Sequence, residues 1–124
     1  MGRDSYEMAR GFGAWPYGTR PTMVLTSRPL PDAPPGVVAR GGDVAAVLAE
    51  MEAAGHTRVW LFGGGRSIAA VAAAGRLDML DLVVVPLVLG DGIPLFAPGT
   101  AGFGLRLIAA EPKPSGAVRL LYAR

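Results

Sequence analysis

Three consecutive glycines, Gly63, Gly64 and Gly65, are the residues of this sequence whose type and spacing most readily suggest chemistry. They follow four apolar residues and precede a run of small residues, which is the pattern of a strand, a tight turn and a helix. Because glycine has no side chain, the backbone can approach a phosphate closely, and the following helix offers free N–H groups to the anion. We expect a dinucleotide-phosphate cradle here, although an ordinary turn between a strand and a helix has the same pattern.

The known glycine fingerprints fit this loop only in part. Gly63 and Gly65 match the first two glycines of G-x-G-x-x-G, but Ile68 stands where the third should be. No Lys-Ser or Lys-Thr pair follows, so the loop is not that of a nucleoside-triphosphate enzyme. The rest of the chain must therefore support or oppose the cradle.

Two further segments carry groups that suit phosphate oxygens. A helix expected at residues 2–10 begins with one of them, and a strand expected at residues 22–26 ends in the other. Their residues are Gly2, Arg3 and Ser5, and Thr26, Ser27 and Arg28. Hydroxyls beside a guanidinium make a receptor for a phosphate monoester, which would favour a 2′-phosphorylated cofactor. The alternatives are ordinary helix capping for the first segment and a simple turn for the second.

The elements that would position these groups alternate along one chain. Asp43 is a typical helix cap, and Gly55 a typical helix stop. Pro86 predicts a bulge or a free edge in its strand. The expected strands are residues 36–39, 58–62, 82–89, 105–109 and 118–122, and the expected helices are residues 43–54 and 68–74. This order predicts a single α/β domain over residues 1–124, with the phosphate-binding ends at the carboxyl edge of its sheet.

Composition excludes several other classes of protein. The chain has 124 residues, no cysteine and one histidine, His56, so thiolate chemistry is excluded and a metal site is not expected. The net charge of +2 comes from arginines and one lysine spread along the chain, which argues against nucleic-acid binding. The longest apolar run is interrupted by Asp81 and Pro86. We therefore expect a cytoplasmic protein with a small-molecule substrate and no membrane partner.

Six motifs occur in a familiar order along nearly the whole chain. They are Gly2-Arg3-x-Ser5-Tyr6-Glu7, Val24-Leu25-Thr26-Ser27-Arg28-Pro29, Val59-Trp60-Leu61-Phe62-Gly63-Gly64-Gly65, Leu77-Asp78-Met79-Leu80-Asp81-Leu82, Pro86-Leu87-Val88-Leu89-Gly90-x-Gly92-x-Pro94-Leu95-Phe96 and Gly116-x-Val118-x-Leu120-x-Tyr122. This order resembles the dihydrofolate-reductase-like family. The resemblance is specific to the C-terminal reductase domain of bacterial bifunctional deaminase-reductases of riboflavin synthesis.

The resemblance implies an NADPH-dependent reductase, and a homodimer, with a three-layer α/β fold, a mostly parallel twisted sheet and antiparallel C-terminal strands. Its acceptor would be a small heterocycle of the 5-amino-6-(5-phosphoribosylamino)uracil type. It implies three groups of cofactor-binding residues: Gly2, Arg3 and Ser5 at the phosphates; Thr26, Ser27 and Arg28 around the 2′-phosphate; and Gly63, Gly64, Gly65, Arg66, Ser67 and Ile68 at the pyrophosphate and near the nicotinamide. No catalytic acid or base is assigned.

Three departures from the family pattern leave alternatives open. Ser5 replaces a threonine and keeps the hydroxyl, whereas Phe62 stands where the riboflavin reductases tend to carry a substrate-binding acid. Such domains also begin well upstream of the position of Met1, with strands that form the centre of the sheet. Without a central strand, residues 58–62 and 82–89 would present open edges, so we expect the functional protein to extend upstream. The alternatives are a non-catalytic NADPH-binding remnant and a dihydrofolate reductase with another acceptor.

Overall fold

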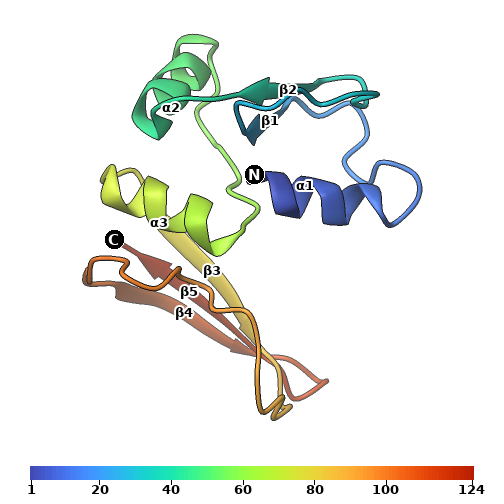
Figure 1. The fold of residues 1–124 in the computed structure, drawn as a ribbon. Coiled ribbons are helices and arrows are strands. Elements are labelled where there is room, and N and C mark those ends of the chain that lie inside the picture. Colours follow the sequence, from blue (N-terminus) through green and yellow to red (C-terminus); the bar gives the residue numbers. More distant parts are fainter.

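The computed structural model describes residues 1–124, and its helices and strands lie in two groups (Figure 1). One group holds β1, β2 and α1, and the other holds α3 and the last three strands, while α2 lies level with β1 and β2 and contacts α3. The elements are α1 (Arg3–Arg10), β1 (Thr22–Leu25), β2 (Val37–Arg40), α2 (Val44–Ala53), α3 (Gly65–Ala73), β3 (Met79–Val84), β4 (Arg106–Pro112) and β5 (Val118–Ala123). Mixed helices and strands, as expected of an α/β chain, are thus present.

The strands form two separate sheets. β1 and β2 pair in parallel, with Thr22 opposite Val37. β3, β5 and β4 form an antiparallel sheet in that order, and a register shift interrupts β4 between Leu107 and Ala109. The antiparallel C-terminal strands were expected, but one mostly parallel twisted sheet is not what these residues form. Only one pair of strands is parallel, because the segment between the two sheets is unpaired.

That unpaired segment is residues 58–62, for which the prediction of a central strand is wrong. None of its backbone N–H or C=O groups makes a hydrogen bond within the chain. A largely apolar and aromatic sequence becomes a strand only beside a partner of matching register, and no such partner flanks this segment. The predicted strand at 82–89 is also shifted, because pairing with β5 begins at Met79 and ends at Val84.

Helix boundaries follow local signals more closely. The side chain of Asp43 accepts a hydrogen bond from the Ala45 N–H at the start of α2, as its position predicted. α2 ends just before Gly55, whose φ of +86° is the left-handed conformation that glycine favours. α3 begins at Gly65, earlier than the expected residue 68, because the glycine loop itself forms the first turn.

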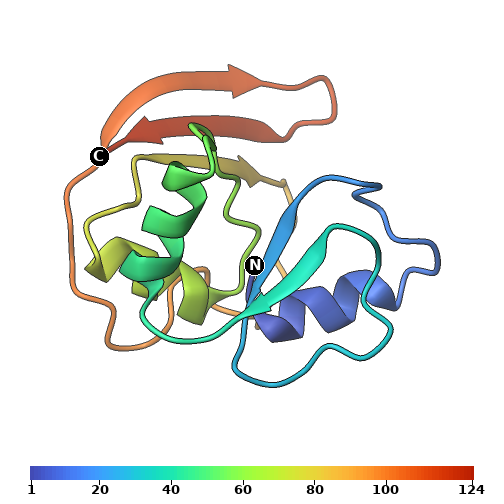
Figure 2. The same cartoon turned by 90° about the horizontal axis from the view of Figure 1, so that it is seen from above.

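Burial is divided between two small cores. One surrounds α3 and contains Ile68, Val71 and Leu77, with Leu61 packed against it. The other contains Tyr6, Val24 and Val37 between α1 and the parallel pair, with Met1 packed against it. Figure 2 shows the molecule from above, with α1 beside β1 and β2, and Figure 1 shows α3 between α2 and the antiparallel sheet. No helix is long and apolar enough to cross a membrane.

Candidate phosphate-binding site

The N-termini of α1 and α3 meet at the glycine loop. The N–H of Gly2 donates to the C=O of Gly63, with the two atoms 2.9 Å apart. A Cβ on Gly2 would lie 2.6 Å from the Oγ of Ser67, and one on Gly64 would lie 3.6 Å from the Oγ of Ser5. Two segments that are far apart in sequence thus bring their backbones and two hydroxyls together.

Neither of these two helices is capped by a side chain. Their N-cap residues are Gly2 and Gly64, and neither cap makes a side-chain hydrogen bond. The N–H groups of residues 3–5 and 65–67 have no hydrogen-bond partner in the chain. Asp43 caps α2, so the difference is specific to the two helices that meet here. Free N–H groups at two helix N-termini favour an anion.

The turn after β1 is tied to this site through Arg3. Its guanidinium donates to the C=O of Pro29 at 3.0 Å and to that of Arg28 at 3.5 Å, and it forms an ion pair with Glu7 at 3.1 Å. The N–H of Arg28 donates to the Oγ1 of Thr26 at 3.2 Å, which holds the turn. Arg3 therefore positions the turn in this structure, a role that the sequence analysis did not predict.

Two other predicted residues lie in different surroundings. Ile68 is buried in the core around α3, where it packs with Val71 and Leu77. The guanidinium of Arg66 is 3.3 Å from the carboxylate of Asp4, and both side chains are highly exposed. Such an exposed ion pair adds little to stability. The structure thus brings together Gly2, Ser5, residues 63–65 and Ser67, and it joins Thr26, Ser27 and Arg28 to them through Arg3.

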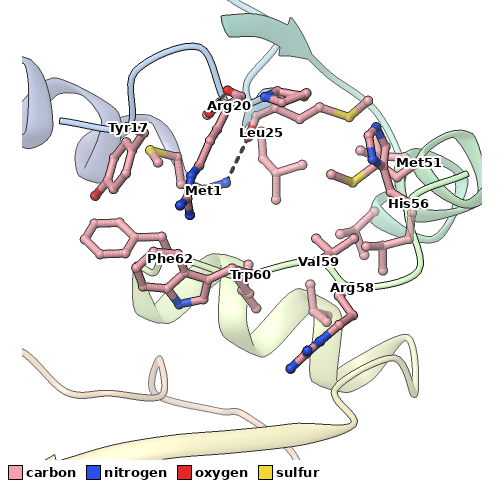
Figure 3. Close-up of a pocket in the computed structure, with 18 residues that line it drawn as sticks. Met1, Tyr17, Arg20, Leu25, Met51, His56, Arg58, Val59, Trp60 and Phe62 are labelled. Atoms are coloured by element: carbon pink, nitrogen blue, oxygen red, sulfur yellow. Dashed lines mark hydrogen bonds between the residues drawn. The ribbon is translucent and has the colours of Figure 1, made fainter. Parts of the chain in front are cut away.

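A groove lies between β1 and residues 58–62, next to the glycine loop. Its cavity of about 320 Å³ is lined by 18 residues, 13 of them hydrophobic, with Trp60 and Phe62 on one wall and Leu25 on the other (Figure 3). The rings of Trp60 and Phe62 lie 5.4 Å apart, and Tyr17 packs against both. The cavity itself was not predicted, although the expected unpaired edge of residues 58–62 indicated an opening at this place.

The amino group of Met1 lies in this groove. It donates to the C=O of Met23 at 2.9 Å. Burial lowers the pKa of this group below its ordinary value, because water is partly excluded from it.

The chain belongs to the RibD C-terminal domain family, whose model matches residues 8–117. The uncharacterized protein YyaP of Bacillus subtilis (strain 168) is 33% identical over 64 residues, which are 52% of this chain and 34% of YyaP. A Shewanella sp. PV-4 structure, of a protein assigned by its name to riboflavin biosynthesis, matches with a TM-score of 0.89 and 25% identity. The match covers 100% of this chain and 71% of that one.

A second solved structure, of a pyrimidine reductase-like protein from Corynebacterium diphtheriae NCTC, has a TM-score of 0.61 and 17% identity. This match covers 82% of this chain and 49% of the Corynebacterium chain. At this identity, the likeness concerns the fold alone. The chain therefore spans about a third of the length of YyaP and half to 71% of the two structures.

Proposed function

We propose that this chain binds NADPH and serves in hydride transfer to a small heterocyclic acceptor, of the 5-amino-6-(5-phosphoribosylamino)uracil type. The observation that carries the proposal is the pair of uncapped helix N-termini, which face each other at Gly2 and Gly64. Membership of the RibD C-terminal domain family and the name of the Shewanella relative support it.

The residues present suit the two charged parts of this cofactor. The free N–H groups of α1 and α3, with the hydroxyls of Ser5 and Ser67, suit a pyrophosphate. The exposed guanidinium of Arg28 makes no hydrogen bond or ion pair within the chain, whereas that of Arg3 is engaged. Arg28 is therefore the better partner for a 2′-phosphate, with the hydroxyls of Thr26 and Ser27 beside it.

The reacting hydride belongs to the nicotinamide of the cofactor, so the chain has to bind and orient rather than to supply a nucleophile. The α1 and α3 termini would fix the phosphates, and the turn held by Arg3 would fix the adenosine end. This division gives Arg3 and Arg28 different tasks. Arg3 sets the position of the turn, and Arg28 contacts the ligand.

The test replaces Arg28 by alanine and titrates NADPH and NADH against the tryptophan fluorescence. One lost charge-assisted hydrogen bond contributes about 1.5–3 kcal/mol, so the Kd for NADPH should rise roughly 10- to 100-fold. The Kd for NADH should stay nearly unchanged. Arg106→Ala is the matched control, because Arg106 is also unpaired but lies on β4 in the other sheet. An Arg28→Ala protein that keeps its preference for NADPH would remove this residue from the site.

A second candidate is a chain that binds NADPH without catalysing reduction. The open groove favours it, since an incomplete sheet leaves no complete wall for an acceptor. Phe62 borders the same groove, so an acceptor other than the aminouracil, as in a dihydrofolate reductase, is the third candidate. Cofactor binding without turnover of either acceptor would support the non-catalytic chain over both reductases.

A further inference from the structure

We propose that Asp91 is a site of spontaneous isomerisation to isoaspartate, through a succinimide that its side chain forms with the backbone nitrogen of Gly92. The product is a substrate for a methyltransferase that uses S-adenosylmethionine and recognises the free α-carboxylate of an isoaspartyl residue. The inference rests on the exposed loop after β3 and is independent of the proposed cofactor and acceptor.

The first observation is the residue pair itself. Asp91 and Gly92 form the single Asp-Gly pair of the chain. Ring closure brings the nitrogen of the following residue to the Cγ of the aspartate, and glycine permits this most readily because it has no Cβ and restricts the backbone least. The chain contains no asparagine, which would form the same ring by losing ammonia. Any isoaspartate in this protein must therefore come from an aspartate.

The second observation is that the two reacting groups already lie in contact. The N–H of Gly92 donates to the Oδ1 of Asp91, with the two atoms 2.7 Å apart. The Cγ that the nitrogen must attack is bonded to that oxygen. The carboxylate of Asp91 makes no ion pair and no other hydrogen bond in the chain, so nothing holds its side chain away from the nitrogen.

The third observation is the freedom of the surrounding loop. Residues 88–96 make no backbone–backbone hydrogen bond, and residues 85–95 are all exposed. A Cβ built on Gly90 or on Gly92 would meet no heavy atom within 4 Å, so the space on both sides of Asp91 is open. The backbone can therefore rotate into the ring, and water can reach the ring once it has formed.

The other aspartates lack this combination of features. Each of them is followed by a residue with a side chain. Asp4 precedes the small residue Ser5, but it lies in the regular backbone of α1. Asp81 lies in β3, and Arg119 bonds both of its carboxylate oxygens. Isomerisation is therefore expected to be concentrated at Asp91.

The reaction requires no reactant other than water. The nitrogen of Gly92 attacks the Cγ of the protonated Asp91 carboxyl, an N–C bond forms, a carboxyl C–O bond breaks, and one water leaves with the amide proton. Water then opens the succinimide at either carbonyl. Opening at Cγ restores aspartate, whereas opening at the main-chain carbonyl breaks its bond to nitrogen and leaves the main chain running through Cγ.

The isoaspartyl form has the same mass but one more methylene group in its main chain. This change lies three residues before Pro94, whose C=O oxygen would be 3.0 Å from a Cβ on Gly65. The α-carboxylate that is set free accepts the methyl group of S-adenosylmethionine, which forms a methyl ester and releases S-adenosylhomocysteine. Modification and methyl transfer thus concern the segment that leads into the contact with the glycine loop.

The experiment ages the intact chain at neutral pH and physiological temperature. It measures methyl transfer from labelled S-adenosylmethionine by a purified isoaspartyl methyltransferase. Methyl acceptance should rise with the time of ageing. A protease that cleaves before aspartate but not before isoaspartate should progressively fail at Asp91 and continue to cleave at Asp78 and Asp81.

Three variants of the chain locate the signal. Asp91→Glu should abolish the rise, because the six-membered ring that glutamate would form closes far more slowly. Gly92→Ala should slow the rise several-fold, because the added Cβ restricts the backbone. Gly102→Ala is the matched control and should leave the rate unchanged, since Gly102 is equally open and does not follow an aspartate.

Three results would overturn the proposal. Absent methyl acceptance, or acceptance that persists in Asp91→Glu, would remove Asp91 as the site. An equal rate in Gly92→Ala and Gly102→Ala would mean that the backbone at Gly92 does not control ring closure. Acceptance that occurs in urea but not in the folded chain would mean that the loop holds the two groups apart.

Discussion

Gly65 shows, at the scale of a single residue, that a glycine in this loop is needed for packing as well as for an open backbone. A Cβ on Gly65 would lie 3.0 Å from the C=O oxygen of Pro94 and 3.2 Å from the N of Ala97. Both neighbours are backbone atoms, which cannot rotate away as a side chain would. The sequence pattern suggested that the backbone at Gly65 is closely approached. One group that approaches it is the backbone of Pro94 and Ala97.

Gly65→Ala should therefore lower the free energy of unfolding by roughly 1–3 kcal/mol, the usual cost of overpacking. Urea unfolding followed by circular dichroism measures it. Gly92→Ala is the control, since Gly92 has no heavy atom near its Cβ position and no positive φ. If both variants unfold at the same urea concentration, the contact with Pro94 does not constrain residue 65.

Arg3 and Ile68 mark the limit of predicting a site residue by residue. Both were expected to contact the cofactor. The sequence does not show which side chains already make contacts within the protein. Arg3 bonds the backbone of the turn at Pro29, and Ile68 is buried in the core around α3. A phosphate contact at residue 68 would have to come from its backbone, and its N–H already donates to Gly64.

The helices were easier to predict than the strands, for a physical reason. A helix start depends on residues close in sequence, so Asp43 and Gly55 defined α2 correctly. A strand depends on a distant partner, and residues 58–62 have a strand-forming sequence but no partner in this chain. The order of the motifs identified the family. It could not predict which strands of this chain would pair with one another.

In the antiparallel sheet, one arginine links three strands. Arg119 on β5 bonds both carboxylate oxygens of Asp81 on β3, at 2.9 and 2.7 Å, and lies 3.4 Å from Glu111 on β4. The hydrogen bonds from Arg119 lower the pKa of Asp81. Lys113, at 2.7 Å, and Arg119 lower the pKa of Glu111. The two carboxylates thus stabilise the sheet only while they are ionised.

Acidification should therefore weaken this sheet. A carboxyl whose pKa is lower in the folded state binds fewer protons there, so its stabilisation is complete above its ordinary pKa of about 4. That contribution is lost as the pH falls through the lowered pKa of the folded protein. Melting temperatures between pH 2 and 7 measure the loss.

Arg119→Met should melt at a lower temperature at pH 7 and show a weaker dependence on acid pH. Arg106→Met on β4 serves as its control, since Arg106 makes no ion pair. If the two variants have the same melting temperature at pH 7 and the same acid dependence, Arg119 does not stabilise the link between the strands.

At the scale of the whole molecule, the groove separates the two cores. Its β1 wall belongs to the core of Val24, and its other wall contributes Leu61 to the core of α3. Just 12 of 124 residues are buried, so each of the two cores is small. At the closed end of the groove, the N–H of Gly2 donates to the C=O of Gly63. The two halves are therefore expected to open separately.

Native-state hydrogen exchange on two variants tests this separation. Val24 is fully buried in one core and Val71 is 5% exposed in the other, so each alanine substitution should cost roughly 1–3 kcal/mol. Val24→Ala should speed exchange in β1 and β2 and leave β3 and β5 unchanged, while Val71→Ala should do the reverse. Equal acceleration across the whole chain in either variant would mean that the halves unfold as one unit. Cooperativity would then have to pass through the closed end of the groove, where the N–H of Gly2 donates to the C=O of Gly63.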